Sequence, residues 1–186
     1  MQITGIILAG GKSTRMGTDK ALLKINEETL LSRAVNLCKS VCSQVLISSN
    51  SVDHEIEEIK RIPDEIINCG PIGGIYSCLK HAENDWSFVI SVDAVFVTTE
   101  FVSFLVSRAN NKYDTVVPVH GKGKEPLIAL YNKSALPFLK KNLKNGIYKM
   151  HHLLEIVNTN FVDSQTWIER HPKIFYNINF PGDLVR

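Results

Sequence analysis

The chain has 186 residues, of which 44% are hydrophobic and 22% are charged, a composition typical of one globular domain. Its 21 basic and 19 acidic residues leave a net charge of +2, too small to indicate a surface that wraps a polyanion. A dedicated nucleic-acid-binding protein is therefore excluded as the leading interpretation. We expect a single domain spanning residues 1–186.

The cysteines and the amino terminus indicate in which cellular compartment the protein is found. The four cysteines form no Cys-x-x-Cys pair, so we expect reduced core residues of an intracellular protein rather than a zinc or redox site. The apolar run within residues 1–8 is too short for a signal peptide or a membrane span, and no basic region precedes it. These features predict a cytoplasmic protein with no membrane contact, and a monomer is the default expectation.

In chain order, short apolar runs alternate with amphipathic stretches. The pattern predicts a strand at 3–8, a helix at 29–41, a strand at 44–48, an exposed helix at 52–60, strands at 87–92, 115–119 and 127–131, and helices at 99–109 and 134–143. Strands that alternate with helices predict a doubly wound, mostly parallel sheet in a three-layer α/β/α fold. In such a sheet, ligands bind outside the carboxyl ends of the strands.

A glycine-rich loop follows the first predicted strand, and residues 8–20 read LAGGKSTRMGTDK. Glycines allow backbone N–H groups to approach phosphate oxygens closely, and Lys12, Arg15 and Lys20 can neutralise phosphate charge. The loop therefore indicates a polyphosphate ligand.

Two common nucleotide motifs do not account for this loop. A P-loop that ends at Lys12 and Ser13 would need a glycine at position 6, where the chain has Ile6. A dinucleotide G-x-G-x-x-G motif is absent because Gly10 and Gly11 are adjacent. A different class of nucleotide loop is indicated.

The pattern Leu-Ala-Gly-Gly-x-x-x-Arg-Met-Gly-x-x-Lys resembles the signature loop of small nucleotidyltransferases, and most closely that of the molybdenum cofactor guanylyltransferase (MobA) family. Residues 70–75 resemble the family's Gly-Pro-x-x-Gly segment, residues 124–131 its Pro-x-x-Ala-Leu strand, and residues 177–184 its terminal Asn-x-Asn segment. The resemblance covers the whole chain and implies a Rossmann-like nucleotidyltransferase domain.

Asp93 ends the apolar strand that precedes it, so its carboxylate should lie at the carboxyl edge of the sheet. A lone carboxylate at that edge suits Mg²⁺, which completes its shell with water and phosphate oxygens. The resemblance implies that Asp93 is the metal ligand. The chain departs from the family's Asp-x-Pro pattern at Val95, which frees the backbone of the metal loop and puts activity, rather than fold, in question.

The resemblance also implies roles for individual residues. Arg15, Lys20 and Asp93 are the implied catalytic residues, and Asn177 and Asn179 are placed on the pterin side. The implied nucleotide-binding residues are Leu8, Ala9, Gly10, Gly11, Lys20, Asn50, Asp64 and Asp93.

The implied reaction is Mg²⁺-dependent transfer of GMP from GTP to molybdopterin, with release of pyrophosphate. The acceptor phosphate is already an anionic nucleophile, so alignment and charge screening matter more than a general base. Transient contacts with cofactor-handling proteins and molybdoenzymes are implied as well. One alternative is the related cytidylyltransferase, whose loop reads Leu-Ala-Ala-Gly, and Gly10 favours guanine over it. Another is a catalytically impaired nucleotide-binding homologue, which Val95 motivates.

Overall fold

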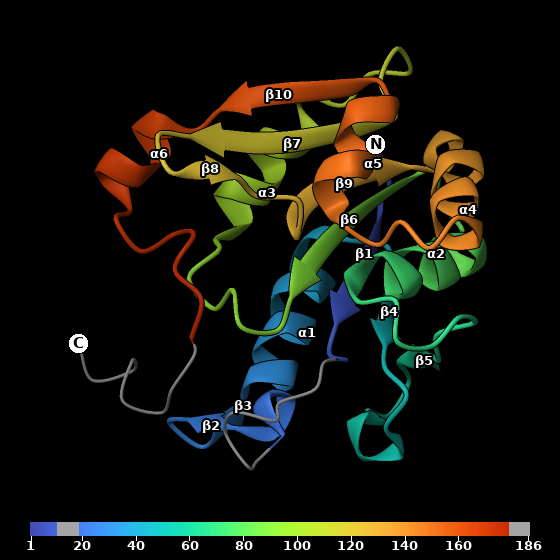
Figure 1. Ribbon diagram of the computed structural model, residues 1–186. Helices are drawn as coiled ribbons and strands as arrows, with labels where there is room; N and C mark the ends of the chain where they lie inside the picture. Colours follow the sequence, from blue (N-terminus) through green and yellow to red (C-terminus); the bar gives the residue numbers. More distant parts are fainter. Residues whose placement is uncertain (11–18, 179–186) are drawn as a thin grey trace.

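A central eight-stranded sheet carries the fold in the computed structural model, which describes residues 1–10 and 19–178 (Figure 1). Its strands are β1 (Thr4–Leu8), β4 (Gln44–Ser48), β5 (Lys60–Ile62), β6 (Trp86–Ser91), β7 (Thr115–His120), β8 (Gly123–Lys124), β9 (Ile128–Asn132) and β10 (Thr159–Asp163). Their order is β10-β7-β9-β6-β1-β4-β5, and β8 pairs with β7. A separate hairpin consists of β2 (Lys24–Ile25) and β3 (Glu28–Thr29).

The sheet is mostly parallel, as the sequence predicted. β6, β1, β4 and β5 run parallel to one another, and so do β10 and β7, whereas β9 is antiparallel to both of its neighbours. Leu8, the last residue of β1, is in register with Ser48 of β4 and Ser91 of β6. The segments that leave these three strands therefore begin at one edge of the sheet.

Helices cover both faces of the sheet and complete the three layers. The helices are α1 (Leu30–Val41), α2 (Pro71–His81), α3 (Thr99–Val106), α4 (Leu136–Lys144), α5 (Met150–Ile156) and α6 (Gln165–Arg170). On β1, Ile7 belongs to the core beneath α1 and α3, whereas Ile6 and Leu8 belong to the core beneath α2, α4 and α5. Successive strand residues point to opposite faces, so one apolar run supplies both cores. α2 and α4 lie against each other (Figure 1).

Helix α1 packs closely against β1. A Cβ atom on Gly5 would lie 2.8 Å from Cys38 Cβ, so the close approach requires glycine at this position. All four cysteines are free thiols, and Cys38, Cys69 and Cys78 are buried. Burial raises the pKa of the Cys78 thiol to about 12, which suits an inert core residue.

The predicted helix at residues 52–60 is wrong. The segment forms a short 3-10 helix, η2 (Val52–His54), followed by an antiparallel bridge between Ile56 and Ile59 and then by β5. Glu58 has φ +65°, in the left-handed region, and a residue in that conformation ends any right-handed helix. Ile56 and Ile59 both pack onto the core beneath α1, so the segment is not an exposed helix.

The sequence analysis also missed several elements. α2 was not predicted, although Pro71 occupies its first turn, where proline is favoured. β5, β10 and α6 were missed too. Among the described residues, no helix is both long and apolar enough to cross a membrane.

Candidate active site

A cleft of about 610 Å³ opens at the carboxyl ends of β1 and β4, and the loop before α2 forms its far wall. Five of the predicted nucleotide-binding residues line it: Leu8, Ala9, Gly10, Asn50 and Asp64. They come from three separate segments of the chain. The sheet register brings them together, because β1, β4 and β5 end side by side.

Backbone contacts fix the floor of this cleft. The Ala9 N–H donates to the Ser48 carbonyl oxygen at 3.0 Å, which continues the β1–β4 pairing past the end of β1. On the α2 side, a Cβ atom on Gly74 would collide with Ser48 Oγ. Glycine at position 74 therefore lets α2 pack directly against the end of β4.

Asn50 and Asp64 both line the cleft and contact each other. The Asp64 N–H donates to Asn50 Oδ1 at 2.8 Å, and Asn50 Nδ2 and Ser48 Oγ lie 3.5 Å from the two Asp64 carboxylate oxygens. Burial raises the pKa of the Asp64 carboxyl, and the bonds from Asn50 and Ser48 oppose that rise. At 3.5 Å these side-chain bonds are weak, so the carboxylate retains acceptor capacity for N–H or O–H groups of a ligand.

Lys20 and Asp93 form an ion pair at the same edge of the sheet. Lys20 Nζ lies 2.9 Å from Asp93 Oδ2, and the two side chains are only 20% and 16% exposed. The Ser91 hydroxyl donates to the other carboxylate oxygen, Oδ1. Lys20 belongs to a 3-10 helix, η1 (Lys20–Leu22), which leads into the β2–β3 hairpin. The carboxylate is thus fixed in direction by two donors.

The carboxy-terminal segment contacts the backbone of Asp93. The Ile178 N–H donates to the Asp93 carbonyl oxygen at 3.0 Å, which places the neighbouring Asn177, an exposed residue, beside the Asp93 loop. Asn177 and Asp93 are 84 residues apart in sequence. The remaining predicted site residues, Gly11, Arg15 and Asn179, lie outside the described residues.

Sequence reasoning missed a further set of polar residues in this cleft. His54 Nε2 lies 2.8 Å from Asp19 Oδ2, and His54 Nδ1 lies 2.6 Å from Ser49 Oγ. Asp19, Ser49 and His54 all line the cleft. Only the adjacency of Asp19 to Lys20 could have drawn attention to them, because His54 was assigned to a solvent-exposed helix.

Asp93 supplies a single carboxylate toward any metal at this edge of the sheet. No cluster of three or more His, Cys, Asp or Glu side chains able to hold a metal occurs in residues 1–10 and 19–178. A metal at Asp93 would therefore need oxygen ligands from water and from substrate phosphates, which is the usual situation for Mg²⁺.

Comparison with known proteins identifies the family. A family model described as the MobA-like NTP transferase domain matches residues 5–160. The chain belongs to this family. A protein named probable molybdenum cofactor guanylyltransferase from Pelotomaculum thermopropionicum is 31% identical over 100% of this chain and 92% of its own. Another of the same name, from Halalkalibacterium halodurans, is 33% identical over 97% of this chain and 94% of its own.

Solved structures agree with this assignment. Molybdopterin-guanine dinucleotide biosynthesis protein A from Archaeoglobus fulgidus superposes with a TM-score of 0.83 at 25% identity, covering 99% of this chain and 96% of its own. The 2-C-methyl-D-erythritol 4-phosphate cytidylyltransferase of Thermus thermophilus, 14% identical, shares the fold with a TM-score of 0.73 over 100% of this chain and 95% of its own. The protein is a nucleotidyltransferase of the MobA-like family.

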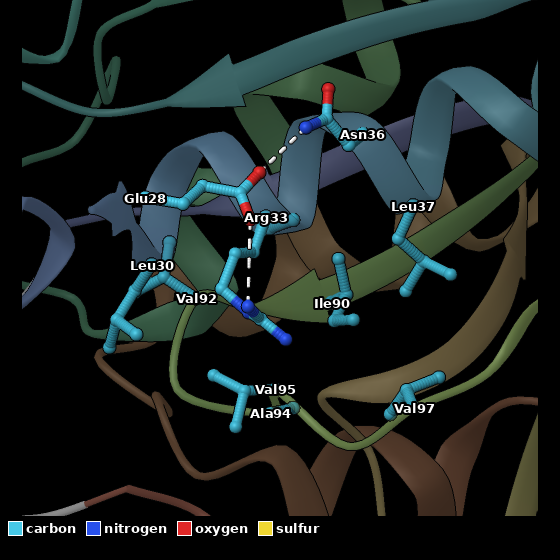
Figure 2. A pocket seen from close by; sticks show the side chains of 11 residues that line it. Glu28, Leu30, Arg33, Asn36, Leu37, Ile90, Val92, Ala94, Val95 and Val97 are labelled. Atoms are coloured by element: carbon cyan, nitrogen blue, oxygen red, sulfur yellow. Dashed lines mark hydrogen bonds and ion pairs between the residues drawn. The ribbon is translucent and has the colours of Figure 1, made fainter. Parts of the chain in front are cut away.

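A second cavity, of about 280 Å³, lies between α1 and the loop that carries Asp93 (Figure 2). Val95, which stands where the MobA pattern has proline, points into it from that loop (Figure 2). Arg33 of α1 borders the same space and pairs with Glu28 at 3.5 Å. Val95 is therefore accommodated in the Asp93 loop, where it faces α1 across this cavity.

Proposed function

We propose that this MobA-like protein transfers GMP from GTP to the terminal phosphate of molybdopterin, forms the guanine dinucleotide cofactor and releases pyrophosphate. The family match and the names of its relatives support this reaction. The observation that carries the proposal is the Lys20–Asp93 pair, a cation and a carboxylate 2.9 Å apart beside a cleft of nucleotide size.

The nucleoside would occupy the cleft. The backbone of Leu8, Ala9 and Gly10 would contact the base and sugar, because this segment lines the cleft without bulky side chains beyond Leu8. Asn50 and Asp64 would complete the nucleoside site, since a carboxylate with spare acceptor capacity recognises N–H and O–H donors.

The triphosphate would then extend toward Lys20 and Asp93. Lys20, together with Arg15, would hold the phosphates and screen their repulsion toward the incoming acceptor phosphate, which needs no strong base because it is already an anion. Asp93 would hold Mg²⁺, and that ion would supply further charge neutralisation to the transferring phosphoryl group. The Ser91 hydroxyl keeps the Asp93 carboxylate directed toward the cleft edge.

The acceptor would approach from the side of the carboxy-terminal segment. The Ile178 N–H donates to the backbone carbonyl oxygen of Asp93, so Asn177 would lie near phosphates bound at Asp93. We assign Asn177 to the pterin side on this basis and on the resemblance of residues 177–184, and we assign Asn179 on the resemblance alone.

Pyrophosphate release from GTP in the presence of molybdopterin and Mg²⁺ tests the proposal. We expect turnover with GTP that a chelator abolishes, and loss of turnover in Asp93→Ala, while the conservative surface variant Asp85→Asn keeps wild-type activity. Thermal stabilisation by GTP, CTP, ATP and UTP gives the base preference, since a ligand at a hundred times its dissociation constant adds about 2.7 kcal/mol of stability. A preference for CTP would identify a cytidylyltransferase, and GTP binding without turnover would identify a catalytically impaired homologue.

A further inference from the structure

A buried histidine joins two segments of the nucleotide cleft. His54, at the end of η2, is only 2% exposed, and its ring lies between Ser49, which follows β4, and Asp19, which precedes η1. Asp19 and His54 are 35 positions apart in sequence. Neither residue belongs to the set that the resemblance implies, so the contact has no assigned role in the reaction.

With a neutral His54 ring, the hydrogen bonds around it have one consistent set of directions. An Asp19 carboxylate can only accept, so His54 Nε2–H donates to Asp19 Oδ2 at 2.8 Å. His54 Nδ1 is then the acceptor for the Ser49 hydroxyl at 2.6 Å. Ser49 Oγ in turn accepts from the Ser51 N–H at 3.0 Å, so its own proton is available for His54. Every polar atom of the ring is therefore satisfied with a single ring proton, on Nε2.

This chain of hydrogen bonds ends at Asp19, the residue next to Lys20 in sequence. The second carboxylate oxygen of Asp19, Oδ1, accepts the Ala21 N–H at 3.0 Å and so caps η1. Lys20 lies between these two residues, and its Nζ extends to Asp93. Asp19 is 40% exposed and could turn toward water, whereas His54 is fixed in the protein interior. The bond to His54 thus holds the Asp19 carboxylate in the orientation that caps η1.

We propose that His54 is a positioning residue that holds Asp19, and through it η1, so that Lys20 is aligned for nucleotidyl transfer. The proposal rests on the proposed guanylyl transfer for its kinetic consequence. Its structural consequence, an η1 cap that depends on His54, is independent of the reaction. His54 does not itself need to touch the nucleotide or the acceptor.

Steady-state kinetics separate positioning from general stabilisation. His54→Phe keeps the aromatic volume but removes both hydrogen bonds, and we expect kcat to fall about tenfold with little change in KM for GTP, because misplaced reacting groups lower the rate rather than the affinity. His54→Gln, whose amide can donate to Asp19 and accept from Ser49, should recover much of that loss. In a Lys20→Ala background, His54→Phe should cause no further loss of kcat, since it acts through Lys20.

Thr4→Val is the matched control for losing buried hydrogen bonds. Thr4 is fully buried at the opposite end of β1 and bonds to Gln44 and Asn84. We expect Thr4→Val to lower the melting temperature and leave kcat unchanged. If His54→Phe behaves like Thr4→Val, or if its effect adds in full to that of Lys20→Ala, the positioning role is overturned. Should His54→Phe fail to fold, Asp19→Ala carries the same kinetic test, because Asp19 is partly exposed.

Amide hydrogen exchange tests the role of His54 in the η1 cap without any measurement of turnover. Exchange at Ala21, whose N–H donates to Asp19, should quicken in His54→Phe and remain slow in Thr4→Val. Ala21 could exchange faster in His54→Phe while the wild-type protein is inactive toward GTP and molybdopterin. That combination would contradict the proposed function but support the dependence of the η1 cap on His54. Unchanged exchange at Ala21 in His54→Phe would overturn the positioning proposal even if the wild-type protein is active.

Discussion

Lys20 Nζ lies 2.9 Å from Asp93 Oδ2, so in this structure the lysine neutralises the carboxylate that the proposed mechanism assigns to Mg²⁺. A cation that binds this oxygen would compete with the lysine, and the phosphates of the nucleotide are partners to which Lys20 could move. We therefore expect the pair to couple metal binding to nucleotide binding.

Lys20→Met tests this coupling. Without the competing ammonium group, Mn²⁺ should bind the nucleotide-free protein about fivefold more tightly, since an ion pair of this kind contributes about 1 kcal/mol. Turnover should nevertheless fall roughly 10²-fold, because the loss of a donor to the transferred phosphate raises the activation barrier by about 3 kcal/mol. Electron paramagnetic resonance of Mn²⁺ and pyrophosphate release measure the two effects. Lys24→Met, at an exposed lysine of β2, is the control, and unchanged Mn²⁺ affinity in Lys20→Met would refute the coupling.

Asp64 makes stability depend on pH in a defined direction. Burial raises the pKa of its carboxyl in the folded protein, so the folded state keeps this proton at pH values where the unfolded chain has released it. Its contribution to stability is therefore present below the unfolded pKa and is lost as the pH rises through the folded pKa. Asp64→Asn removes the cost of the buried charge. Its melting temperature should exceed that of the wild type at neutral pH.

Thermal melts across the acidic range measure this effect. The advantage of Asp64→Asn should shrink toward about pH 4, where an ordinary aspartate is half protonated. GTP affinity should fall in the same variant, because the amide offers one acceptor oxygen instead of two. Asp85→Asn, at an exposed aspartate, should show no gain in melting temperature. An advantage that grows on acidification would show that burial of the Asp64 charge is not its origin.

Gly5 should tolerate no larger side chain. A Cβ atom there would meet Cys38 Cβ at 2.8 Å, so Gly5→Ala should separate α1 from β1 and lower the free energy of unfolding by about 1–3 kcal/mol. Gly121→Ala is the matched control, because the nearest atom to its Cβ would be Gln165 Oε1 at an ordinary 3.8 Å. Urea unfolding of both variants gives the comparison. Equal stability of Gly5→Ala and wild type would mean that the α1–β1 spacing adjusts without cost.

The sequence predicted the sheet better than it predicted the site. The strands that end near Leu8, Ser48 and Ser91 were found because each is a short apolar run, and the fold rule for parallel sheets then placed Asp93 at the correct edge. Asn50 and Asp64 came from the resemblance alone. Their contact depends on a loop path that local periodicity does not encode.

His54 shows why the rest could not be predicted. Its neighbours Ile56 and Ile59 are spaced as on a helix, but the left-handed turn at Glu58 makes them an antiparallel bridge instead. The burial of His54 depends on its bond to Asp19, a contact between distant segments. Single-sequence patterns report local periodicity, and a polar residue buried by a long-range partner resembles an exposed one.

Val95→Pro tests whether the departure from the MobA pattern limits the enzyme. Val95 is the second residue of a turn in which the Val97 N–H approaches the Ala94 carbonyl oxygen at 3.5 Å, and proline is favoured at that position. Proline should therefore restrict the unfolded chain more than the folded one and raise stability by up to about 1 kcal/mol, less the packing lost where Val95 lines the second cavity.

Turnover of Val95→Pro decides between two views of the natural residue. Asp93 keeps its bonds from Ser91 and Lys20 although Val95 replaces proline, so we expect a higher melting temperature with unchanged kcat. A large increase in kcat would instead show that the Asp93 loop is insufficiently ordered in the natural protein. In that case a weakly active wild type would owe its low rate to residue 95, and its nucleotide site would not need to be defective.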